Sequence, residues 1–353
     1  MNTNDTLRGK FLVASAALLL LVQGCAALGN RSTPGSYAVA ERVTIGGNGG
    51  WDFIALDQFR QRLFITRGDR VQVWSIQSKK LVGEIEGTAG VHGVALAQDL
   101  KRGFTSNGRS NTVAVFDLET LKVVDTISIP GDNPDAILYE PRFKRVYCFN
   151  GRSGNVTVID AVNLKVLANV ALGGKPEVAV SDGAGHVFVN VEDSAELVVI
   201  DQATNAVQAR WPLAPCTNPT GLALDTLHRR LFSVCDNHKM VILDAQSGRQ
   251  VAIMTIGGAP DGAEYDPSFD MVISSNGDGT LTFMHEDDPE HFTVVANVPT
   301  QEKARTLALD SASHRIYLVT ALFGPTPAQT AEQPRPRPPV LPDSFTVIVV
   351  APK

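Results

Sequence analysis

Short apolar strands recur along the whole chain, each followed by a polar turn that contains Asp, Asn or Gly. One complete unit has a small apolar strand, a turn, a second strand such as 230–233, a third such as 239–244, and a fourth such as 250–256. β-branched residues alternate with other types in these segments, as is typical of strands. The pattern therefore predicts four short β-strands per unit.

The unit recurs seven times. The residues that lead the first strand of each copy stand at positions 52, 92, 135, 177, 220, 261 and 305, so the intervals lie between 40 and 44 residues. Repeats of this length with four strands each are typical of propeller blades. We therefore predict an all-β fold, a seven-bladed β-propeller of four-stranded blades.

The two ends of the repeat array complement each other. The last unit stops after its third strand, 345–350, and an unmatched strand at 38–45 precedes the first unit. This N-terminal segment is similar to the outer strand at 250–256, including the glycines that follow it. We expect the N-terminal strand to complete the last blade, so that residues 38–350 form one domain without a long exposed edge.

Composition narrows the class of protein further. Of the 353 residues, 44% are hydrophobic and 19% charged, which excludes a disordered or collagen-like chain. The 30 glycines and 20 prolines agree with a fold that has many turns. Lys and Arg total 31 against 37 Asp and Glu, with a formal net charge of −6, so the overall charge argues against nucleic acid as a partner.

The first residues have the features of an export signal. Arg8 and Lys10 precede an apolar run at 11–22, which is too short to span a bilayer, and small residues follow. We predict a signal peptide at 1–24 and a linker at 25–37.

The end of the signal resembles a bacterial lipobox, in which the cysteine is acylated after cleavage. Cys25 is the candidate lipidation residue, although Gln23 departs from the small residue preferred there. Because no Asp follows Cys25, the resemblance to Gram-negative lipoproteins implies the periplasmic face of the outer membrane. The alternative is cleavage near Ala27 and a soluble periplasmic protein. The membrane would thus be contacted only through the N-terminal lipid anchor.

Three cysteines lie inside the predicted propeller. Cys216 and Cys235 are expected at the same face of the fifth blade, and an exported compartment permits a disulfide between them. The alternative is two free thiols. Cys148 lies in an apolar strand and is expected to be a buried free thiol. The three show no metal-ligand spacing.

The repeats resemble those of a known family. The segments 173–180, 187–190 and 197–201 match the YVTN repeat of YncE-type propellers, a family of exported seven-bladed proteins. The resemblance covers the whole mature chain and implies the fold. It implies little about function, because the family is described as periplasmic or surface-associated without an agreed reaction.

In a propeller, the first strands of all blades start at one mouth of the central channel. Six of the seven leading residues are ionisable, and like charges gathered in a ring shift one another's pKa values and attract cations. The alternative is that these side chains cap the channel end by bonding to backbone N–H groups. The candidate ligand-binding residues are Asp52, His92, Asp135, Glu177, Asp261 and Arg305, with Thr220 as the seventh leading residue.

The loops between the second and third strands reach the same face. In blades one to three they bring Arg67, Arg109 and Arg152 outside the acidic ring, an arrangement that suits a polar or zwitterionic ligand. A proline-rich loop at 324–343 interrupts blade seven and also faces the mouth. We expect it to be a tolerated surface insertion, and the alternatives are that it shields the channel or presents a peptide to a partner.

The leading hypothesis is an exported, lipid-anchored binding module that holds a small polar ligand, a divalent metal ion or an envelope protein through the ring. No cofactor motif is evident, and a monomer is expected. The alternative is a hydrolase similar to propeller lactonases, with a ring carboxylate and His92 as base and Arg305 holding an oxyanion. The other histidines are expected to be solvated surface residues: His186, His228, His238, His285, His291 and His314.

Overall fold

The computed structural model of the protein describes residue 1, residues 35–330 and residues 336–353. The predicted signal peptide, apart from its first residue, and the candidate lipidation residue Cys25 lie outside the described residues. Within the described part of the chain, no helix has the length and apolar character needed to cross a membrane.

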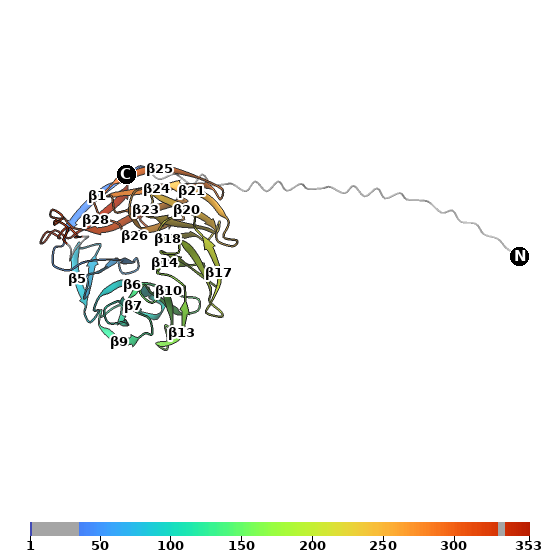
Figure 1. Ribbon diagram of the computed structural model, residues 1–353, viewed down its shortest axis with the longest axis horizontal. Coiled ribbons are helices and arrows are strands. Elements are labelled where there is room, and N and C mark those ends of the chain that lie inside the picture. Colours follow the sequence, from blue (N-terminus) through green and yellow to red (C-terminus); the bar gives the residue numbers. More distant parts are fainter. Residues whose placement is uncertain (2–34, 331–335) are drawn as a thin grey trace. The chain divides into compact units, whose positions relative to one another are not determined.

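Seven four-stranded antiparallel sheets form the propeller, as the repeat predicts, and Figure 1 shows them arranged around a centre. Blades one to three, written from the inner to the outer strand, are β2 (Ile54–Asp57), β3 (Arg62–Thr66), β4 (Val71–Ser75), β5 (Lys80–Ile85); β6 (Val91–Ala97), β7 (Arg102–Asn107), β8 (Thr112–Asp117), β9 (Val123–Ser128); and β10 (Pro134–Glu140), β11 (Arg145–Asn150), β12 (Asn155–Asp160), β13 (Lys165–Ala171). A short 3-10 helix, η1 (Gln98–Leu100), follows β6.

The remaining four blades repeat the same order. They are β14 (Pro176–Ser181), β15 (His186–Val191), β16 (Glu196–Asp201), β17 (Ala206–Pro212); β18 (Pro219–Asp225), β19 (Arg230–Cys235), β20 (Lys239–Asp244), β21 (Gln250–Thr255); β22 (Pro260–Asp266), β23 (Met271–Asn276), β24 (Thr280–Asp288), β25 (His291–Pro299); and β26 (Leu307–Asp310), β27 (Arg315–Thr320), β28 (Thr346–Pro352), β1 (Tyr37–Thr44).

The N-terminal strand closes the ring. β1 pairs antiparallel with β28, and the register runs from Tyr37 opposite Pro352 to Thr44 opposite Thr346. Just beyond the strand, the backbone N–H of Ile45 donates to the carbonyl of Phe345 at 2.8 Å. The predicted closure is therefore confirmed: the first strand of the described chain supplies the outer strand of the last blade.

The hydrophobic core lies between neighbouring blades. Side chains alternate along each strand, so the two faces of a blade pack against the blades on either side. Phe64 of blade one and Phe116 of blade two are fully buried, with ring centroids 5.7 Å apart. Gly103 makes this packing possible, because a Cβ atom there would lie 2.0 Å from the Phe116 ring.

An acidic residue closes the turn between the first and second strands in six blades. Its carboxylate accepts hydrogen bonds from backbone N–H groups two or three residues further on, a common role of Asp in turns. The six residues are Asp57, Glu140, Asp182, Asp225, Asp266 and Asp310. Because each inner strand starts at the mouth, these turns lie at the opposite face.

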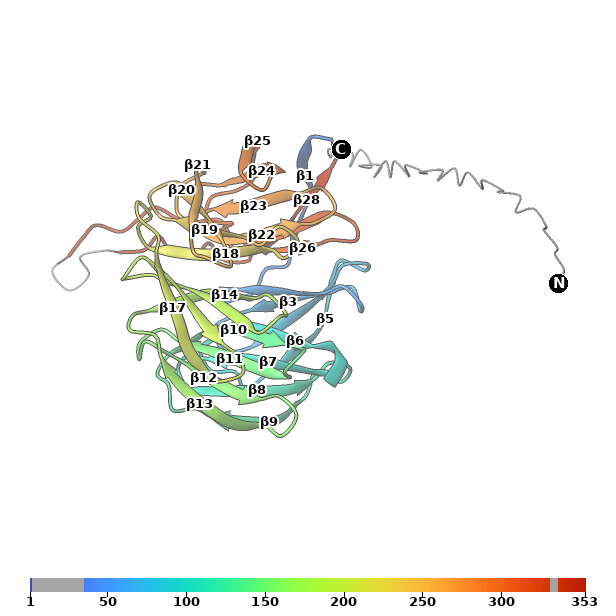
Figure 2. The same ribbon diagram turned by 90° about the vertical axis from the view of Figure 1, so that its right-hand side faces the viewer.

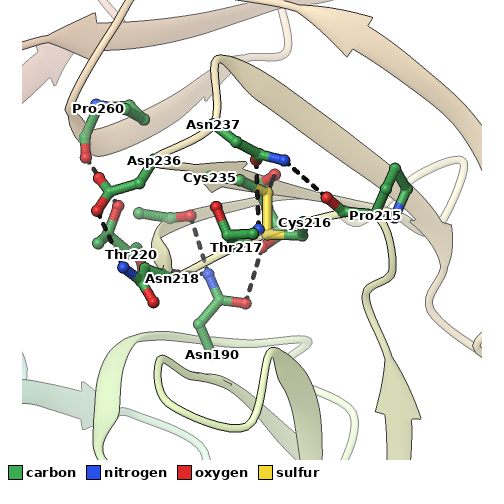
Figure 3. Close-up of a disulfide and its surroundings, with 12 residues drawn as sticks. Asn190, Pro215, Cys216, Thr217, Asn218, Thr220, Cys235, Asp236, Asn237 and Pro260 are labelled. Carbon is green, nitrogen blue, oxygen red and sulfur yellow. Dashed lines mark hydrogen bonds between the residues drawn. A yellow bond between two sulfur atoms is a disulfide. The ribbon is translucent and has the colours of Figure 1, made fainter.

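A disulfide joins Cys216 in the loop before β18 to Cys235 at the end of β19, the pairing suggested by the sequence (Figure 3). The two Cα atoms are 5.4 Å apart. Beside it, Asn237 donates a side-chain hydrogen bond to the carbonyl of Pro215 at 2.7 Å. Cys148 is a buried free cysteine.

Loss of the disulfide should destabilise the propeller. Closing an interval of this length restricts the unfolded chain, so the Cys216→Ala/Cys235→Ala variant should lose about 3 kcal/mol of unfolding free energy, measured by urea denaturation. A reductant should lower the stability of the wild type and leave the double variant unchanged. Equal stability of wild type and double variant would contradict the expectation.

Candidate functional site

The leading residues of the inner strands surround one channel mouth. A cavity of about 180 Å³ is lined by side chains from blades one and three to seven, so residues far apart in sequence share one chamber. Six of the seven predicted ring residues line it directly: Asp52, Asp135, Glu177, Thr220, Asp261 and Arg305. The seventh, His92, lines the adjoining outer pocket and contacts Asp52.

His92 is held between two carboxylates. Its Nδ1 lies 2.7 Å from Asp52 Oδ2 and 3.8 Å from Asp135 Oδ1. The hydrogen bond with Asp52 raises the pKa of His92, although burial acts in the opposite direction. Burial raises the pKa of Asp135 to about 6, despite the lowering influence of His92. The three groups can share a proton or offer three ligand atoms to one cation.

A second cluster lies on the blade four side of the mouth. Lys175 Nζ is 2.6 Å from Glu177 Oε1 and also bonds to Glu192. Burial, followed by the charge of Asp135, raises the pKa of Glu177. Burial also opposes the charge of Lys175, but its bonds to Glu177 and Glu192 outweigh that effect and raise the pKa of Lys175. Lys175 thus forms ion pairs with two carboxylates.

Blades six and seven contribute a third pair. Arg305 Nε lies 3.2 Å from Asp261 Oδ2, and Asp261 is only 6% exposed. Burial raises the pKa of Asp261 to about 7, even though Arg305 acts to lower it. The chamber is therefore lined by two basic side chains, Lys175 and Arg305, and by six carboxylates, those of Asp52, Asp135, Glu177, Glu192, Asp236 and Asp261.

A wider pocket of about 730 Å³ lies over blades one to three and shares Asp52 and Arg305 with the chamber. Arg109, Arg152 and Arg337 line it as well. Arg152 lies 3.5 Å from Asp132, whereas Arg109 and Arg337 make no ion pair with any described residue. Basic side chains thus rim the outer pocket, and carboxylates dominate the chamber.

Arg67 does not belong to this rim, although the sequence placed it there. Its guanidinium is buried, lies 3.7 Å from the centre of the Phe345 ring and donates to the carbonyls of Gly47 and Asn48. Burial lowers its pKa to about 10. Arg67 therefore fastens the loop before blade one.

Two mouth residues were missed in the sequence. Lys175 directly precedes the Pro-Glu pair that opens β14, and this position is a usable signal. Arg337 had none, because it lies in the proline-rich loop, which was expected to be a tolerated insertion. A bridge between Phe323 and Val340 ties the loop together at its base. Figure 2 shows the described parts of this loop, between β27 and β28, extending away from the sheets.

The expectation of solvated histidines was wrong for most of the set. In five of the six, a nearby Asp carboxylate lies 2.7 or 2.8 Å from the imidazole Nδ1. His238 is exposed as expected, and so is His291, at 76% of its side chain. The pairs are His186 with Asp182, His228 with Asp225, His285 with Asp287, His291 with Asp288, and His314 with Asp266.

Next to the chamber, the channel holds a more apolar cavity of about 210 Å³. Phe53, Phe149 and Leu307 are among the side chains that line it. Glu264 is a carboxyl in this apolar lining, and burial raises its pKa to about 7. The acidic mouth therefore borders an environment that solvates charge poorly.

The fold and the charged mouth define the class of protein, a seven-bladed β-propeller with an ionisable ring at one end of its channel. Residues 37–185 match the family model described as YNCE-like beta-propeller, which confirms the resemblance found in the repeats.

Comparisons with solved structures support the fold alone. Hydrazine synthase of Kuenenia stuttgartiensis is similar, with a TM-score of 0.69 and 18% identity, over 77% of this chain and 93% of that chain. The structure of U3-55K is similar with a TM-score of 0.73 and 12% identity, over 89% of this chain and 99% of that chain. No curated protein matches the sequence.

Burial of Asp261 should make stability depend on pH. Its folded pKa is above its unfolded value, so the wild type loses stability as pH rises through the interval from about 4 to about 7. The Asp261→Asn variant lacks this loss. Its stability relative to wild type should rise by about 2–3 kcal/mol between pH 5 and pH 8, measured by urea unfolding.

The matched control is Asp236→Asn, which removes an exposed carboxylate from the same mouth. Its relative stability should change much less over the same pH range, because the charge of Asp236 acts on Asp261 less than burial does. Parallel pH profiles for wild type and Asp261→Asn would contradict the role given to burial.

Proposed function

We propose that this protein is a binding module whose channel mouth holds a small zwitterionic ligand. The ammonium end would lie in the acidic chamber and the anionic end among the arginines of the outer pocket. The observation that carries the proposal is the excess of carboxylates over basic groups in a partly desolvated chamber that opens directly into an arginine-rimmed pocket.

The chamber favours a cation for electrostatic reasons. Asp135 and Asp261 are buried carboxyls whose pKa values are raised to about 6 and about 7, so ionising them without a counter-charge is costly. An ammonium group supplies both a charge and three hydrogen-bond donors. A bound ammonium group would therefore stabilise the ionised carboxylates of Asp135 and Asp261, which otherwise favour the protonated form.

The outer pocket favours an anion. Guanidinium groups bind carboxylates and phosphates through paired hydrogen bonds, and Arg109 and Arg337 have no carboxylate partner among the described residues. Because the two compartments share Asp52 and Arg305, one small molecule of mixed charge can contact both. A divalent cation or a segment of an envelope protein could bind in the chamber, but neither would explain the arginines of the outer pocket.

The cellular setting is part of the proposal. An export signal at residues 1–24 and acylation of Cys25 would place the propeller, as a monomer, at the periplasmic face of the outer membrane. Cleavage without acylation would leave it soluble in the periplasm. In both cases the ligand would come from the cell envelope.

Thermal unfolding against a ligand panel tests the proposal. The panel holds amino acids, matched amines without a carboxylate, matched carboxylates without an amine, divalent cations, sugar lactones and short oligonucleotides. A zwitterion at about 100 times its dissociation constant should add about 2.7 kcal/mol of stability and raise the midpoint. Each half-ligand should give a smaller shift at the same concentration.

Two variants assign the ends of the ligand. Asp135→Asn/Glu177→Gln should abolish the shift in thermal midpoint that amine-containing compounds cause. Arg109→Ala should reduce the shift caused by the zwitterion and leave the shift caused by the plain amine unchanged. Arg67→Lys serves as a control outside the pocket, because its contacts are structural. A panel without any shift, or shifts that survive in the acidic double variant, would contradict the proposal.

The hydrolase alternative rests on one contact, that of His92 with Asp52 at 2.7 Å, since a carboxylate that orients an imidazole is a common arrangement for a general base. It requires turnover of members of the lactone panel that His92→Asn abolishes. A thermal shift without turnover favours the binding module.

A further inference from the structure

A second cluster of titratable side chains lies at the opposite face, in the turn between β18 and β19. His228 Nδ1 is 2.7 Å from Asp225 Oδ2 in the same turn and 3.3 Å from Glu286 Oε1 on β24 of the next blade. The three ligand atoms all lie within 4.8 Å of one another. The cluster is therefore a junction between blades five and six.

Glu286 is the unexpected member. Glu286 occupies an equivalent position in the repeat, toward the end of the third strand or directly after it. In six blades, the backbone N–H at this position donates to a carbonyl in the turn between the first and second strands. Four of the other blades have an apolar residue there and one has a glutamine, namely Ile76, Leu118, Ala161, Ala245 and Gln202. A carboxylate thus occupies a position that the repeat otherwise fills with uncharged side chains.

The Glu286 carboxylate has no hydrogen-bond partner. Its side chain is 0% exposed, and neither oxygen makes a hydrogen bond with a described residue. His228 Nδ1 likewise makes none, despite its short distances to the two carboxylates. A buried ionisable group without a partner is costly, so this arrangement points to a ligand that the protein atoms do not supply.

Neighbouring groups that might have served Glu286 are engaged elsewhere. Arg230 donates to Asp244, Glu290 and the carbonyl of Pro289, and the Tyr265 hydroxyl donates to Asp270. Burial, followed by the charge of Asp225, raises the pKa of Glu286 to about 8, although the nearby Tyr265 hydroxyl and the charge of Arg230 act to lower it. The cluster therefore consists of two carboxylates and one imidazole, and no Lys or Arg side chain belongs to it.

Blade one shows how the same turn is neutralised without a ligand. Arg60 stands three residues after Asp57, as His228 stands three residues after Asp225, and its guanidinium lies 3.2 Å from the Asp57 carboxylate. Blade five replaces this permanent cation with an imidazole, whose nitrogen can bind a metal. One imidazole nitrogen and two carboxylate oxygens are a donor set typical of Zn²⁺, Mn²⁺ or Co²⁺, with water completing the coordination.

We propose that Asp225, His228 and Glu286 bind one divalent transition-metal ion that links blades five and six at the face opposite the channel mouth. The site is separate from the ligand chamber, because Asp225 is the last residue of β18, whereas Thr220 near the start of that strand lines the chamber. Its role is structural, since the ion would bridge two blades through buried ligands.

Cobalt binding tests this site directly. The protein is treated with a chelator, dialysed and titrated with Co²⁺ alone. The visible absorption of protein-bound cobalt is recorded together with calorimetric heat and the thermal midpoint. The wild type should gain a cobalt absorption band and a higher midpoint. Glu286→Gln should lower the Co²⁺ affinity by at least about 100-fold.

Controls separate this site from other candidates. His314→Asn removes a comparable Asp–His turn contact in blade seven and should leave the band unchanged. His92→Asn should also keep it, although Asp52, His92 and Asp135 form the other three-ligand cluster. If Glu286→Gln does not fold, His228→Asn serves in its place. No cobalt band in the wild type, or a band lost in His92→Asn and kept in Glu286→Gln, would overturn the proposal.

Discussion

The pairing of β1 with β28 is the constraint on which the structure depends, because a propeller positions its channel residues only when the ring is closed. The register from Tyr37 opposite Pro352 to Thr44 opposite Thr346 joins the two ends of the described chain in one sheet. Each inner strand then starts at the same mouth, and equivalent repeat positions become neighbours in space. The charged chamber is a consequence of this geometry, since no local segment could assemble it.

Closure also explains the electrostatics of the mouth. Carboxylates from different blades share one chamber, where six of them face two basic side chains, Lys175 and Arg305. Their burial beside an apolar channel raises the pKa values of Asp135 and Asp261, because ionised groups are poorly solvated there. The outer arginines do not relieve this imbalance in the chamber, so the two compartments differ in charge and together favour a ligand of mixed charge.

The repeat made the blades, the closing strand and the ring predictable, because interval and strand order determine which residues share a mouth. Side-chain partnerships were less predictable. Arg67 and Arg109 both lie in the loop between the second and third strands of their blades, yet Arg67 packs on Phe345 and donates to carbonyls of the loop before blade one. Arg337 lies in an insertion outside the repeat. The carboxylate of Glu286 stands out only when equivalent positions of the blades are compared in the structure.

The central claim is that ring closure desolvates the mouth carboxylates. Carboxyl-carbon NMR of the ligand-free propeller, with Asp135 and Asp261 assigned through their Asn variants, measures this most directly. The account predicts titration midpoints of about 6 for Asp135 and about 7 for Asp261. Midpoints for both residues near the ordinary value of about 4 would contradict it, because the chamber would then solvate its carboxylates as water does.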